Sequence, residues 1–241
     1  MVAPSPLTAR SAASAVWTGR EVVVWGGTAG ERPLGDGAAY DPATDTWRTI
    51  AGSPLVPRLG AITVWTGEEM VVWGGEAGER AFADGAAYDP AADHWRPLAE
   101  APLTARLPGR AAWTGRELLA FGGRVGEQRL TDGAAYDPAA DRWRSLTTSP
   151  AVAREGATSI WTDRELVVWG GFSGGQVWPD GAAYDPESDT WRPIPAWRGR
   201  VAATAAWADG EMLVWGGLAP GAGGEFEVAG DGARYRPDAP R

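Results

Sequence analysis

Apolar and polar positions alternate along this chain in a repeat of about 48 residues. Trp17, Trp65, Trp113 and Trp161 recur every 48 residues, and Trp207 follows 46 residues later. Each tryptophan precedes a short polar turn, three apolar residues, an aromatic residue and a Gly-Gly pair. No segment carries the 3.6-residue apolar period of a helix, so a repeat of this length indicates a β-propeller with several strands in each unit.

Turn residues divide each repeat into four predicted strands. In the first repeat the strands are expected at 12–17, 21–25, 37–40 and 46–50. The first strand is built from small residues, the second is apolar without alternation, and the fourth carries tryptophan and arginine. Small side chains fit near a propeller axis, unbroken apolar runs suit a strand covered on both faces, and bulky residues fit the wider rim.

Three motifs recur in this frame, and in the first repeat they are Gly26-Gly27, Tyr40-Asp41-Pro42 and Trp47, seven residues after the tyrosine. The pattern resembles the kelch motif and recurs five times, with a truncated last copy and with Phe121 in place of the tryptophan before one Gly-Gly pair. The resemblance implies an all-β, kelch-type β-propeller with five blades of about four antiparallel strands around a central channel. It implies function only weakly, because kelch propellers include both interaction modules and enzymes.

The repeats organise the chain as a single domain, with units at about 11–58, 59–106, 107–154, 155–200 and 201–241. Residues 1–10 match the linker 50–58 between units. The last repeat ends one residue before its expected outer tryptophan. Either the fifth blade has three strands, or the chain is cut from a longer protein.

Composition removes several classes of chemistry. The chain has no Cys, Lys or Asn and only one histidine, His94, which excludes disulfides, Schiff bases and multi-histidine metal sites. A net charge of −9 argues against nucleic acid as a partner. No apolar run is long enough for a membrane span, so we expect no membrane partner. With one histidine and no cysteine we expect no metal. We also expect no cofactor and a monomer. Without a signal peptide, the chain is either cytoplasmic or a processed secreted form.

An arginine ends each loop that leads into an innermost strand: Arg10, Arg58, Arg106, Arg154 and Arg200. In kelch propellers this loop lies around the channel mouth, where arginines could clamp carboxylates or phosphates. The alternative is structural pairing with one of two repeated acid columns. These are the Glu column (Glu21, Glu69, Glu117, Glu165 and Glu211) and the Asp column (Asp36, Asp84, Asp132, Asp180 and Asp231).

Residues that break the repeat are the other candidates. Phe172 and Trp178 lie in the fourth variable loop, and Trp197 lies in the shortened linker to the last blade. Aromatic residues beside arginine anchor many recognition surfaces. Equally, Trp178 and Trp197 could fill gaps left by an irregular fifth blade.

Arg110 places a charge on an innermost strand where other repeats have Ser, Ile or Thr. It is either a ligand contact in the channel or a partner of an acid such as Glu155. The sole histidine, His94, falls in an outer-rim turn, where a solvated surface position is expected.

The sequence therefore predicts a recognition scaffold that binds an acidic peptide or a small anionic ligand at the channel mouth, through the arginines, Phe172, Trp178 and Trp197. An enzyme of the lyase, cyclase or isomerase type is the first alternative, with Glu155, Glu225 or Glu227 as acid and base opposite Arg110. A structural domain of a larger protein is the second.

Overall fold

The computed structural model describes residues 2–107, 109–151, 153–221 and 225–237. All regular structure in these ranges is β-strand, so they contain no helix that could cross a membrane. The chain divides into two compact units, residues 1–128 with 133–145 and residues 129–132 with 146–241. Each unit is described by itself.

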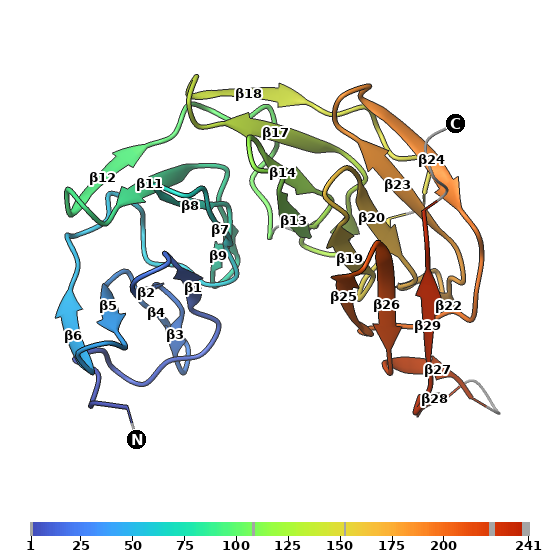
Figure 1. Ribbon diagram of the computed structural model, residues 1–241, viewed down its shortest axis with the longest axis horizontal. Coiled ribbons are helices and arrows are strands. Elements are labelled where there is room, and N and C mark those ends of the chain that lie inside the picture. Colours follow the sequence, from blue (N-terminus) through green and yellow to red (C-terminus); the bar gives the residue numbers. More distant parts are fainter. Residues whose placement is uncertain (1, 108, 152, 222–224, 238–241) are drawn as a thin grey trace. The chain divides into compact units, whose positions relative to one another are not determined.

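The first unit contains three four-stranded antiparallel sheets, which we call blades one to three (Figure 1). Strand order within each blade follows the sequence, from an innermost strand to an outer strand. The strands are β1 (Ser14–Trp17), β2 (Val22–Trp25), β5 (Gly37–Asp41) and β6 (Thr46–Thr49); β7 (Ile62–Trp65), β8 (Met70–Trp73), β11 (Gly85–Asp89) and β12 (His94–Pro97); β13 (Arg110–Trp113), β14 (Leu118–Phe121), β17 (Gly133–Asp137) and β18 (Arg142–Ser145).

The second unit contains a four-stranded blade four and a three-stranded blade five. The strands are β19 (Thr158–Trp161), β20 (Leu166–Trp169), β23 (Gly181–Asp185) and β24 (Thr190–Ile194), followed by β25 (Thr204–Ala208), β26 (Glu211–Trp215) and β29 (Gly232–Tyr235). Within the described residues, no fourth strand pairs with β29.

A short hairpin stands between the second and third strands of every blade. The hairpins are β3 (Thr28–Ala29) with β4 (Arg32–Pro33), β9 (Glu76–Ala77) with β10 (Arg80–Ala81), β15 (Arg124–Val125) with β16 (Gln128–Arg129), β21 (Phe172–Ser173) with β22 (Gln176–Val177), and β27 (Leu218–Pro220) with β28 (Phe226–Val228). They lie in the segments that the sequence marked as variable loops. Strands of two or three residues are too short to show an alternating pattern, which is why the sequence does not reveal them.

The strand boundaries follow from backbone geometry. The expected strand at 12–17 begins only at Ser14, because Ala12 has a φ of 51° and cannot belong to an extended strand. The Gly-Gly pair ends the second strand where the chain turns back. Gly27 has a φ of +89°, and a Cβ there would lie 2.6 Å from the carbonyl oxygen of Ser11.

Tryptophan pairs form much of the packing between neighbouring blades of the first unit. Trp25 in β2 lies 5.7 Å from Trp95 in β12, and Trp73 in β8 lies 5.5 Å from Trp143 in β18. Trp25 and Trp73 are each only 1% exposed. The indole columns thus fill the widening space between adjacent sheets.

A hydrogen-bond network joins the linkers before blades two, three and four to the blade that follows. Tyr88 donates to Asp93 at 2.6 Å, while Asp93 accepts from the Ala51 N–H and the indole of Trp95 donates to the Ala51 carbonyl. At the N-terminal segment, Ala3 makes the corresponding two contacts with the first blade. Residues 1–10 thus make the contacts of a linker.

Candidate functional site

The arginine column is buried and engaged with the protein itself. The Arg58 guanidinium donates to the Gly74 carbonyl at 3.2 Å and to the Asp84 carboxylate at 2.7 Å, and Nε donates to the Val56 carbonyl. Its side chain is 0% exposed. Every part of this guanidinium is therefore used within the scaffold.

The other members of the column are also directed toward the protein itself, although Nε of Arg154 and Nε of Arg200 have no described hydrogen-bond partner. Arg10, Arg154 and Arg200 pair with Asp36, Asp180 and Asp231 at 3.0, 2.8 and 2.5 Å, with side chains 5–6% exposed. Arg106, 1% exposed, donates to the Gly122 carbonyl and to Thr104. These contacts support the structural-pairing alternative, with the Asp column as partner.

The electrostatics of the Asp column agree with this pairing. The Arg10 hydrogen bond lowers the pKa of Asp36, and the Arg200 hydrogen bond lowers the pKa of Asp231. The carboxylates thus stay charged beside their arginines at neutral pH. Little guanidinium surface is left for a ligand.

The Glu column serves a different set of arginines at the other end of the blades. Glu21 binds Arg48 through both carboxylate oxygens, at 3.0 and 2.8 Å, and Arg48 also donates to the Tyr88 hydroxyl of the next blade. Glu69 binds Arg96 in the same way. Each pair links the turn after the first strand to the outer strand.

Trp178 occupies a repeated position, contrary to its interpretation as a residue outside the columns. Its N–H donates to the Gly171 carbonyl, as Phe82 does to Gly75. Its ring lies 4.8 Å from Arg154 Cζ, as the Phe82 ring lies 3.9 Å from Arg58 Cζ. The sequence alone does not show this correspondence, because the residue at this position changes between Leu, Phe and Trp.

Trp197 fills the place of a missing outer tryptophan. Its ring lies 5.5 Å from Trp169 and is half-buried in the core of the second unit. In the first unit, the corresponding Trp25 and Trp73 pack against outer-strand tryptophans of the next blade. The described part of blade five has no outer strand, and Trp197 from the linker substitutes for it.

Phe172 belongs to a small apolar surface on the second unit. It lies 5.5 Å from Phe226 in an edge-to-face contact, and Phe226 and Val228 are 47% and 85% exposed. Exposed aromatic and aliphatic side chains on a hairpin can contact a ligand.

Arg110 is the arginine among the candidates that has no described carboxylate partner. It begins β13, opposite Phe121 of β14, and is half-buried. Its one described hydrogen bond reaches the carbonyl of the adjacent Gly109 at 3.5 Å, and no described carboxylate pairs with it. Burial lowers the pKa of Arg110, because the charged form loses water without gaining an anion.

The remaining candidates are either paired with another residue or exposed at the surface. Glu155 pairs with Arg129 of the same unit, and Glu225 and Glu227 are exposed. His94 is an exposed residue at the start of β12. Among the described residues, no three or more His, Asp or Glu side chains are arranged to hold a metal ion.

Comparisons with known proteins agree with this architecture. A family model described as the KLHDC2/KLHL20/DRC7 Kelch-repeats domain matches residues 2–150. The chain is also similar to a solved structure titled "Structure of YjhT", with a TM-score of 0.71 and 17% identity, over 95% of this chain and 82% of that chain. No curated protein matches. The repeated sheets and both matches indicate an all-β propeller of about five blades.

Proposed function

The chain belongs to the kelch-repeat family, a fold with a general role in binding and scaffolding, and on this premise we propose that Arg110 recognises an acidic group of a peptide or a small anionic ligand. In a kelch-type propeller the innermost strands line the channel. A ligand bound to Arg110 of β13 would therefore enter through the channel mouth.

The observation that carries the proposal is a half-buried guanidinium that has no counter-anion among the described residues. A charge that is removed from water and left unpaired destabilises the folded protein. An incoming carboxylate or phosphate would supply the missing partner and could bind a guanidinium through two parallel hydrogen bonds. Arg110 is thus a better ligand contact than Arg58, whose donors are already engaged.

The equivalent residue of blade two supports the same interpretation. Ile62 begins β7, which packs against β13, and it is 7% exposed. An apolar side chain is therefore accepted at this position of the repeat. The arginine in blade three is not needed for packing, which favours a role in binding.

The test uses fluorescence anisotropy with a labelled hexaglutamate peptide, and with sulfate as a competitor. We expect Arg110→Gln to weaken peptide binding at least tenfold, and the wild-type affinity to fall as salt rises from 25 to 200 mM. Sulfate competition would identify a small-anion site, whereas a peptide that sulfate does not displace would identify a longer acidic contact.

The matched control is Arg142→Gln, which removes the same charge from an exposed position of β18 in the same unit. It should change the affinity less than twofold. Equal weakening by both variants, or unchanged binding by Arg110→Gln, would overturn the proposal.

A further inference from the structure

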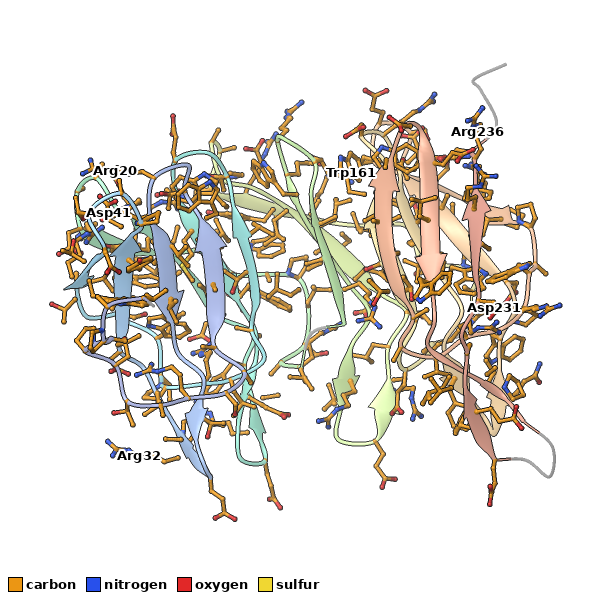
Figure 2. The ribbon with its side chains drawn as sticks, turned by 60° about the horizontal axis from the view of Figure 1, so that its bottom comes forward. Arg20, Arg32, Asp41, Trp161, Asp231 and Arg236 are labelled. Carbon is orange, nitrogen blue, oxygen red and sulfur yellow. The ribbon has the colours of Figure 1, made fainter. Side chains whose placement is uncertain are left out.

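A second candidate site lies in the first unit, at the ends of blades one and two that carry the turns after the first strands. A cavity of about 530 Å³ opens there, and Trp65, Glu68, Asp89 and Pro90 contribute to its walls. Figure 2 shows the corresponding end of blade one, where the labelled Arg20 and Asp41 lie close together and Arg32 lies at the opposite end. The cavity is therefore remote from the hairpin end of these blades.

Three of the blades close this position with an ion pair. The arginine of the turn contacts the aspartate that ends the third strand, in Arg20–Asp41 at 3.6 Å, Arg116–Asp137 at 3.8 Å and Arg164–Asp185 at 3.3 Å. Blade two has Glu68 where these blades have arginine. Asp89 is therefore the corresponding aspartate that has no ion pair with any described arginine.

The two carboxylates of blade two have spare acceptor capacity. Asp89 Oδ1 accepts from the N–H groups of Ala91 and Ala92, while no described residue donates to Oδ2. Glu68 is exposed, and no described donor reaches its carboxylate. Arg48 and Arg96 are paired with Glu21 and Glu69, which also line the cavity, and neither arginine forms a described ion pair with Glu68 or Asp89.

Trp65 in the wall of the cavity is a second, independent indication that the cavity binds a cation. In the second unit, the indole of Trp207 donates to Asp163 of the preceding turn at 2.9 Å. The residue that corresponds to Asp163 in blade one is Gly19, so the half-buried Trp65 has no such acceptor among the described residues. A ring beside unpaired carboxylates suits a planar cation, which gains both charge pairing and stacking.

We propose that this cavity binds an arginine side chain of a partner protein. The arginine would take the place that Arg20, Arg116 and Arg164 hold in their own blades, with its guanidinium on Asp89 and Glu68 and its face against Trp65. Arg20 at the rim is already directed to Asp41 and is 82% exposed, so it leaves the cavity accessible. The partner's arginine thus completes between two proteins an ion pair that blades one, three and four complete within themselves.

The decisive variant is Glu68→Arg, which restores the pattern of the three other blades and fills the site from within. The probe is a capped, fluorescein-labelled Gly-Arg-Gly peptide, with its citrulline analogue as the uncharged equivalent, measured by anisotropy. We expect Glu68→Arg to weaken binding of the arginine peptide at least tenfold, and the citrulline peptide to bind neither protein. The thermal midpoint should not fall, since arginine is native at this turn in three blades.

Glu79→Arg is the matched control, because it makes the same charge change at an exposed hairpin position of blade two. A net charge of −9 attracts any basic peptide, and this control measures that general attraction. If Glu79→Arg weakens binding as much as Glu68→Arg, or if Glu68→Arg binds like the wild type, the inference is wrong. Arg110→Gln should leave this binding intact, so failure here and failure of the anion site can be told apart.

Discussion

Blades two and five contain nearly the same second strand in different surroundings. In β8, Met70, Val71, Val72 and Trp73 are all 0–1% exposed. In β26, Met212 and Val214 are buried, whereas Leu213 and Trp215 are 38% and 64% exposed. The strand in blade five therefore alternates in burial, although its sequence is continuously apolar.

The difference shows that burial of these strands depends on neighbouring sheets and not on the strand alone. Blade two lies between two blades of the first unit, since β7 contacts both β1 and β13. In the second unit, β25 contacts β19, and the core contains Met212 and Val214 together with Val167 and Trp169 of blade four. An apolar strand is thus buried on both faces where two blades pack against its sheet, as in β8, and on one face where a single blade does, as in β26.

The largest expected effect is a difference in unfolding free energy between alanine variants of the same tryptophan position in these two blades. Trp73→Ala should lower the free energy of unfolding by about 3–5 kcal/mol, because it leaves a cavity between sheets. Trp215→Ala should lower it by less than about 1 kcal/mol, because most of that side chain already contacts water. Urea denaturation with matched m-values measures both. Equal losses would mean that Trp215 is covered in solution.

Variants of Trp197 test whether a tryptophan in a linker can replace the packing of an outer-strand tryptophan. Trp197→Ala should destabilise the protein by about 2 kcal/mol, since it removes the ring that packs on Trp169 at 5.5 Å. Trp197→Phe keeps an aromatic ring and should lose less than half as much. Urea midpoints compare the two variants, and a loss below about 0.5 kcal/mol for alanine would contradict the substitution of Trp197 for an outer strand.

Much of this architecture can be predicted from the sequence because the same residues mark the same structural feature in several repeats. The four-strand pattern, the Gly-Gly turn at Gly27 and the short fifth blade all follow from columns of residues. The choice between Asp84 and Glu69 as partner of Arg58 does not, because both acid columns have the same period. Only the antiparallel register places Asp84 at the loop end and Glu69 at the opposite end.

For the candidate sites, too, the sequence shows which residues break a column, and the structure shows which contacts those residues lack. Arg110 stands out in the sequence because it breaks a column, and the structure adds that no described acid pairs with it. Glu68 breaks a column equally clearly, but its meaning requires the Arg20–Asp41 contact, which joins residues 21 positions apart. Trp178 looked irregular only because its column varies in size. A departure from the repeat is informative once the contact made by the regular residue is known.

Tyr88 gives the most specific expected effect, in the fully packed blade two. Burial, followed by the hydrogen bond to Asp93, raises the pKa of Tyr88 from 10.0 to about 12. Below pH 10 the hydroxyl is protonated in both folded and unfolded chains. Between pH 10 and 12 the unfolded chain releases the proton while the folded chain keeps it, so this contribution to stability is lost as pH rises through the folded pKa.

Tyr88→Phe removes this titration together with two hydrogen bonds, the one that the hydroxyl donates to Asp93 and the one that it accepts from Arg48. At neutral pH the variant should be less stable by about 2 kcal/mol, about 1 kcal/mol for each bond. The difference from the wild type should then narrow between pH 10 and 12, because only the wild type carries the buried hydroxyl. Urea midpoints at each pH, with tyrosinate absorbance in parallel, measure the narrowing. A constant difference across this range would show that the Tyr88 hydroxyl ionises at its ordinary pKa, and that blade two is less tightly closed around it than its packing indicates.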